Sequence, residues 1–228
     1  MKYVLNNRIF LMCYIIAIVF GIYIGYTETD TFIISYATKF SLVLIRYIIM
    51  GISIIISYYV FKYLSSDILI LRKKNMFNAM LYIVKIEIIL VSILMLLVHI
   101  PVLLLNFSQF FENFWMIFKI FINSILVLTF INSLIRIINL FTKNYAFACG
   151  SVLIAYCLLD FIVEHLNWFS FLDNVFDFGY IFILPYLYKD YYLMFIILIF
   201  LLLFFNSCYT FYGIKKDYFL KSESDEKD

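Results

Sequence analysis

The sequence predicts an all-α integral membrane protein with six transmembrane helices. Of its 228 residues, 66% are hydrophobic and only 14% are charged, whereas an ordinary soluble domain is about 45–50% apolar and about 25% charged. A water-soluble fold of this length cannot hide so much apolar surface. The apolar stretches are also continuous, whereas membrane-spanning strands alternate in polarity.

Six apolar segments are long enough to cross the hydrocarbon core, which takes about 20 residues per helix. They are Ile9–Tyr26, Phe40–Phe61, Ile86–Leu105, Trp115–Leu140, Tyr145–Val163 and Tyr191–Gly213. The first has a basic start but no small-residue cleavage site after it, so we expect a retained span. Residues 1–214 are then expected to form a single membrane domain, and residues 215–228 a short charged tail.

The distribution of Lys and Arg sets the predicted orientation. With six spans both termini lie on one side, and most Lys and Arg residues flank that side, including Arg72, Lys73 and Lys74. The opposite side is acidic and includes Asp173 and Asp177. Because cytoplasmic loops carry the excess of Lys and Arg, we expect both termini in the cytoplasm and a multi-pass location in the cell membrane.

The sequence lacks the motifs of several functional classes. The net charge of +2 leaves no polycationic surface for nucleic acid, and neither a P-loop nor an HExxH motif is present. His99 and His165 lie on different elements and cannot supply a metal site alone. A structural role is favoured for His99 over a proton-linked one. We therefore expect no catalytic residue, cofactor or metal.

A polar stripe interrupts the fourth predicted span. Asn132, Arg136 and Asn139 are spaced by four and three residues, which places them on one helix face. A polar stripe inside a membrane either holds helices together or lines a translocation path. The spacing is compatible with both.

Two further spans carry ionisable residues. Arg46 lies about 9 Å inside the second span. It either reaches the outer headgroups or pairs with Asp160 or Glu164 in the fifth. Lys85 and Glu87 begin the third span. Since residues two apart do not face each other on a helix, we expect interfacial anchors rather than an ion pair.

Two of the predicted loops are unusual. In the inner loop, Asp67 can cap a short apolar turn that precedes the basic cluster Arg72, Lys73 and Lys74. This pattern predicts a short interfacial helix, which either docks a partner or only keeps the loop inside. The outer loop is apolar without spanning, and it runs from Trp168, past Asp173 and Asp177, to Pro185. It predicts a re-entrant or interfacial hairpin.

This layout resembles the type-2 ABC exporter permease family over nearly the whole chain. The segment Asp67–Lys85 is similar to that family's coupling region, and Trp168–Pro185 lies where the family has an external hairpin. The resemblance implies that Asp67, Arg72, Lys73 and Lys74 contact a separate cytoplasmic ATPase. It also implies a pore formed by a homodimer or a heterodimer with a related permease, and no catalytic residues in this chain. Short permeases of this kind often serve peptide export or self-protection against bacteriocins.

We therefore expect a permease subunit of an ATP-driven exporter, with a peptide or an amphipathic small molecule as substrate. The alternative is a non-transporting immunity or sensor protein that captures a cationic membrane-active peptide on its acidic outer surface. An intramembrane enzyme is disfavoured because no acid–base or metal constellation is present.

Overall fold

The computed structural model describes residues 8–26, 43–64, 76–166 and 199–210, and all the elements in these ranges are helices. They are α2 (Arg8–Gly25), α4 (Val43–Leu64), α6 (Met76–Leu105), α7 (Phe107–Glu112), α8 (Phe114–Thr142) and α9 (Tyr145–Leu166), followed by a helix at Ile199–Thr210. The all-α prediction is confirmed for this part of the chain. The predicted inner-loop helix, outer hairpin and charged tail lie outside the described residues.

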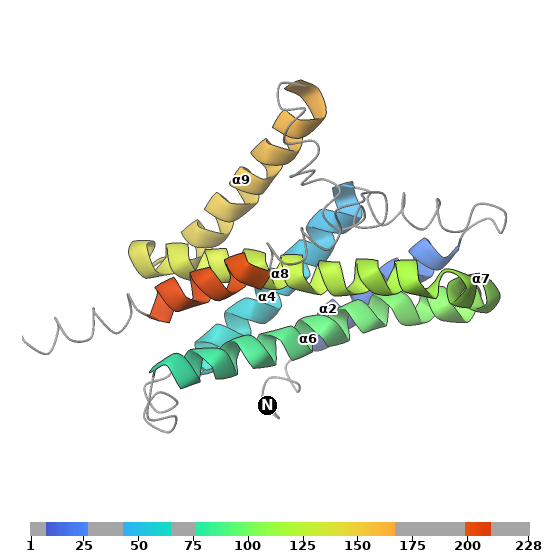
Figure 1. The fold of residues 1–228 in the computed structure, drawn as a ribbon, viewed down its shortest axis with the longest axis horizontal. Coiled ribbons are helices and arrows are strands. Elements are labelled where there is room, and N and C mark those ends of the chain that lie inside the picture. The colour runs from blue at the N-terminus through green and yellow to red at the C-terminus, as the bar shows by residue number, and fades with distance from the viewer. Residues whose placement is uncertain (1–7, 27–42, 65–75, 167–198, 211–228) are drawn as a thin grey trace, which may run out of the picture.

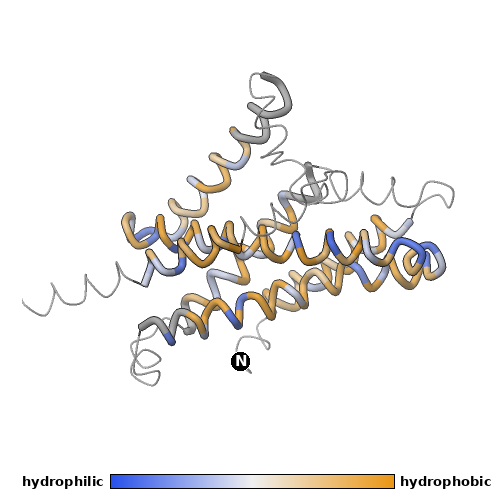
Figure 2. The backbone as a smooth tube through the Cα atoms, in the orientation of Figure 1, coloured by the Kyte–Doolittle hydropathy of each residue, from blue (hydrophilic) through white to orange (hydrophobic). Residues whose placement is uncertain are grey.

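Within these described ranges, three helical segments are long and apolar enough to cross a membrane: Arg8–Gly25, Leu81–Leu105 and Phe114–Thr142. Shorter apolar segments occupy Tyr47–Phe61, Tyr145–Leu158 and Ile199–Thr210. Figure 2 shows apolar residues along all of these helices, with hydrophilic residues gathered at α7 and at the turn between α8 and α9. This pattern is that of a membrane protein.

Helix α2 packs closely along α6 (Figure 1), and small residues make the close approach possible. A Cβ atom on Gly21 would clash with the carbonyl oxygen of Val98 and would lie 3.0 Å from Pro101 Cγ. One turn later, a Cβ on Gly25 would lie 3.0 Å from both the Val102 Cα and a Leu105 methyl group. Small residues four apart let two membrane helices approach in this way.

The C-terminal end of α6 is joined to α8 by a short helix that the sequence did not predict. Asn106 precedes α7, and its side-chain amide donates a hydrogen bond to the carbonyl oxygen of Gly25 at the end of α2. This bond satisfies one of the carbonyls that every helix leaves unpaired at its C-terminus. It fixes the end of α2 against the α6–α7 corner.

Helices α8 and α9 are separated by a tight turn at Lys143 and Asn144. Lys143 has left-handed backbone geometry (φ 53°), and its N–H donates a hydrogen bond to the Asn139 carbonyl at 2.8 Å. The Asn144 side-chain oxygen accepts a hydrogen bond from Phe147 N at 3.1 Å, which is the usual way to cap a helix N-terminus. After the turn, α9 makes a steep angle with α8 (Figure 1). It stays in contact with α4, where the ring of Tyr156 packs edge-on against that of Tyr47, with 5.8 Å between their centroids.

Candidate functional site

Six polar side chains of α8 are fully enclosed by the other helices, and four of them, Thr129, Asn132, Ser133 and Arg136, share one face of the helix. The residues concerned have exposed fractions of 2% or less, and they are Asn123, Ser124, Thr129, Asn132, Ser133 and Arg136. The three hydroxyl groups among them donate to carbonyls of the preceding turn, at distances of 2.7–2.9 Å. Their own helix accepts the protons of these hydroxyls. Contacts with other helices are made by Asn132, by Arg136, and by Ser133, whose oxygen also accepts a hydrogen bond.

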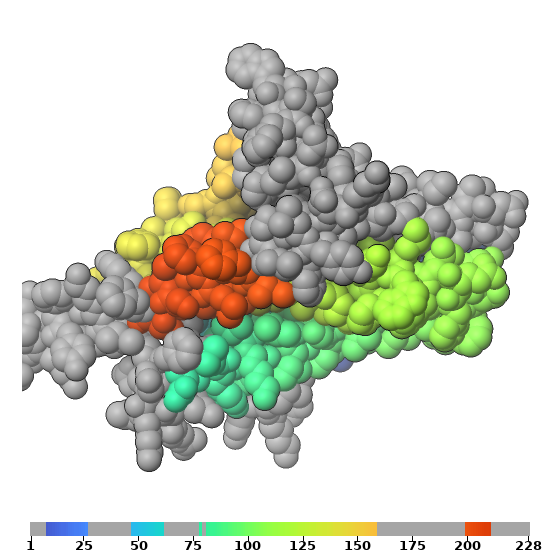
Figure 3. Space-filling model, viewed as in Figure 1, coloured from blue at the N-terminus to red at the C-terminus, as the bar shows by residue number. Residues whose placement is uncertain are grey.

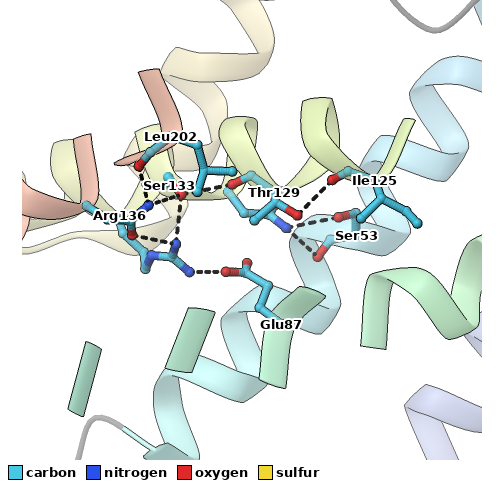
Figure 4. Close-up of polar contacts among 9 residues, drawn as sticks. Ser53, Glu87, Ile125, Thr129, Ser133, Arg136 and Leu202 are labelled. Carbon is cyan, nitrogen blue, oxygen red and sulfur yellow. Dashed lines mark hydrogen bonds and ion pairs between the residues drawn. The ribbon is translucent and has the colours of Figure 1, made fainter. Parts of the chain in front are cut away.

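Arg136 forms a buried ion pair with Glu87 of α6 (Figure 4). One guanidinium nitrogen of Arg136 donates to the Glu87 carboxylate, and the two side chains are 1% and 0% exposed. Each residue lies six positions from the end of its apolar segment, Leu81 for α6 and Thr142 for α8, so both are about 9 Å deep. The pair therefore joins two antiparallel helices at a common depth.

The second terminal nitrogen of Arg136 extends the contact to a third helix. It donates to Ser133 Oγ at 2.8 Å and to Asn206 Oδ1 at 3.2 Å. Asn206 in turn donates to Ser133 Oγ at 3.1 Å and to the Leu202 carbonyl at 2.7 Å. The helix Ile199–Thr210, which carries Asn206, lies against α8 in the space-filling view (Figure 3).

A fourth helix joins the same face of α8 one turn deeper. The Asn132 amide nitrogen donates to Ser53 Oγ of α4 at 2.9 Å, and Ser53 is fully buried. We call the residues Ser53, Glu87, Asn132, Ser133, Arg136 and Asn206 the polar junction. Because α8 contributes three of its six members, the junction connects α4, α6 and the helix Ile199–Thr210 through α8.

The polar junction is not fully hydrogen-bonded within the described part of the chain. Three buried atoms there lack a partner: Glu87 Oε1, Asn132 Oδ1 and Arg136 Nε. A buried polar atom without a partner costs about 1–3 kcal/mol, and more where the group is charged. Two of the three atoms belong to the ion pair itself. The described helices therefore satisfy only part of the hydrogen-bonding capacity of both charged groups.

The structure brings together only some of the residues that the sequence singled out. Asn132 and Arg136 lie in the junction, whereas Asn139 is half-buried and contributes its backbone carbonyl to the end of α8. Arg46 lies in α4 and Asp160 in α9, but their side chains are outside the described residues. The predicted coupling residues Asp67, Arg72, Lys73 and Lys74 and the hairpin residues Trp168, Asp173, Asp177 and Pro185 also lie outside them.

The expectation that Glu87 is an interfacial anchor is wrong. Lys85 is exposed, whereas Glu87 is completely buried and paired with Arg136. The two residues do point to different sides of α6, as their spacing requires. The prediction inferred exposure from the position of Glu87 near the start of its span. Burial depends instead on which neighbouring helix covers the residue.

Sequence reasoning also missed Ser53, Asn206 and the glycine contact between α2 and α6. Ser and Asn inside apolar spans are a signal for helix association, and both residues stand in such spans. The pattern Gly21-x-x-x-Gly25 is an equally direct signal. These patterns indicate that a residue contacts another helix, but not which helix.

His99 is held inside the bundle by contacts of a structural kind. Its Nδ1 lies 2.7 Å from the Met95 carbonyl, and its ring packs edge-on against Phe121 at 5.3 Å. Within the described ranges, no three His, Cys, Asp or Glu residues gather as metal ligands.

The chain matches no protein-family model, no curated protein and no solved structure.

Proposed function

We propose that the chain is the membrane-spanning permease subunit of an ATP-driven exporter of the ABC type. In this proposal it crosses the cell membrane six times, has both termini in the cytoplasm and pairs with a second permease copy or a related chain. ATP is hydrolysed on a separate cytoplasmic subunit. The substrate is a peptide or an amphipathic small molecule.

The observation that carries this proposal is the buried Glu87–Arg136 pair. A buried ion pair is seldom the most stable way to join two helices, since apolar residues of similar volume often hold them as well or better. Ionisable groups inside a membrane commonly mark a transport path or a moving part. A junction with three unpaired atoms favours a function that uses a second arrangement of the same helices.

The position of α6 supports a route by which an ATPase drives this rearrangement. Helix α6 begins at Met76, directly after the segment proposed to contact the ATPase. Glu87 follows eleven residues later, which is about 16 Å along a helix. Because a helix transmits displacement along its axis, a movement of that segment would act directly on Glu87 and its contact with α8.

The experiment that tests the proposal is purification of the tagged chain in a mild detergent from cells that express it at a native level. We expect an ATPase subunit to co-purify in stoichiometric amount. A purified chain without any ATPase would overturn the proposal. If that chain still protects cells from a cationic membrane-active peptide, the immunity or sensor function replaces it.

A further inference from the structure

A pocket of about 710 Å³ opens where α2 begins, α4 nears its end and α9 begins. Its lining includes Ile9 of α2, Ile54 and Ile55 of α4, and Cys149 of α9. Three tyrosines, Tyr58, Tyr59 and Tyr145, complete most of the wall. The pocket lies at the end of the helices that the distribution of Lys and Arg predicts to be cytoplasmic.

The exposed polar side chains of this pocket lie at the turn between α8 and α9. Lys143 and Asn144 form the turn between α8 and α9, and both are exposed. The remaining lining is aliphatic, aromatic or sulfur-containing. The pocket therefore fits a ligand with one charged end and one apolar end.

The charge around the pocket favours an anion. Arg8 is exposed and adjacent in sequence to Ile9, and Lys143 is exposed at the α8–α9 turn. Of the acidic side chains that the structure describes, Glu87 is buried in its ion pair and Glu112 lies beyond the opposite end of α8. Neither carboxylate competes with a bound anion for Lys143.

We propose that this pocket binds an anionic phospholipid of the inner leaflet. The acyl chain occupies the apolar wall formed by Ile54, Ile55 and their neighbours. The phosphate lies at the mouth near Lys143, whose long stem lets the ammonium group sit at headgroup level. Anionic lipids are concentrated in the cytoplasmic leaflet, and Lys and Arg at the membrane surface attract them. This inference does not depend on transport.

The native cysteines provide a matched pair of probes. Cys149 lines the pocket, whereas Cys157 lies eight residues later on α9 and is exposed outside it. Two single-cysteine proteins, each with the other three cysteines replaced by serine, are labelled with a small fluorophore. Each protein is reconstituted in mixed bilayers of phosphatidylglycerol and phosphatidylcholine. In one sample the phosphatidylglycerol carries bromine on its acyl chains, and in a second sample the phosphatidylcholine does. Bromine quenches the fluorophore on contact, so quenching reports which lipid lies beside it.

The quantity compared is the ratio of quenching by brominated phosphatidylglycerol to quenching by brominated phosphatidylcholine. This ratio cancels the difference in exposure between the two positions. We expect this ratio to be about fivefold higher at Cys149 than at Cys157. One lysine near the membrane surface favours an anionic lipid by about 1 kcal/mol, which corresponds to about fivefold. In the Lys143→Gln protein the two ratios should become equal. Equal ratios in the unmodified background would overturn the proposal.

A second measurement avoids a label inside the pocket. The full-length protein, with all four cysteines intact, is extracted in mild detergent, and its retained lipids are weighed by native mass spectrometry. We expect a retained anionic phospholipid that is lost in Lys143→Gln but kept in Lys85→Gln, since Lys85 is exposed but does not line the pocket. Excess inorganic phosphate should not displace it. Retention unchanged by Lys143→Gln, or displacement by phosphate alone, would refute a lipid site.

Discussion

The guanidinium of Arg136 on α8 and the carboxylate of Glu87 on α6 are paired inside the helix bundle, 49 positions apart in sequence. The same guanidinium contacts Ser133 and Asn206, so one side chain joins three helices. Removing either charge leaves the other buried and unpaired, which is far more costly than removing both. This relationship makes the pair testable by mutation.

We expect Arg136→Met and Glu87→Leu each to lower the free energy of unfolding in detergent by about 3 kcal/mol, because each leaves a buried charge alone. The double variant should lose much less than the sum of the two single losses. A double-mutant cycle measured by denaturant titration gives the coupling directly. Additive losses would mean that the two groups do not interact.

The contact between α2 and α6 predicts different outcomes at two helical glycines. Gly21→Ala should destabilise the protein by about 1–3 kcal/mol, because the added methyl group meets the Val98 carbonyl. Gly51→Ala is the control, since an added Cβ there meets nothing within 4 Å. Alanine is the better helix former, so Gly51→Ala should be neutral or stabilising by up to about 1 kcal/mol.

Thermal denaturation of the two glycine variants in the same detergent provides the comparison. A midpoint for Gly21→Ala equal to or above that of Gly51→Ala would show that α2 does not approach α6 as closely as described. Further truncation is not possible at Gly21, so the alanine variant is the sharpest test of this contact.

The left-handed backbone of Lys143 predicts a stabilising substitution. A residue with a Cβ pays about 1–2 kcal/mol in this conformation, whereas glycine does not. Lys143→Gly should therefore raise the free energy of unfolding by about 1 kcal/mol. Lys143→Ala removes the same charge but keeps the Cβ, and should show no such gain. Chemical denaturation in lipid-free detergent separates this effect from lipid binding.

The proposed ATPase contact predicts loss of coupling without loss of membrane insertion. Reversal of Arg72, Lys73 and Lys74 to Glu should abolish transport in reconstituted vesicles, because the cluster, now acidic, would repel the surface that the basic residues are proposed to bind. The control reverses Lys215, Lys216 and Lys221, which removes the same charge from the same predicted side. Equal transport by the two variants would place the ATPase contact elsewhere.

The sequence by itself determined the class of the molecule and the local structure of its helices. Long apolar runs form helices in a membrane because only internal hydrogen bonding satisfies the backbone there. The spacing of Asn132 and Arg136 was sufficient to place both on one face of α8, and both are buried in the polar junction. These properties depend on helix geometry within a single segment.

Only the tertiary structure decided which groups meet. Glu87 was predicted to anchor α6 at the interface, yet it pairs with Arg136, and Ser53 and Asn206 complete the contacts of α8. A helical repeat specifies which residues share a face. It does not specify how the helix is rotated toward its neighbours, or which residues of two neighbouring helices lie at the same depth. Those choices come from packing, such as the close approach of Gly21 to Val98.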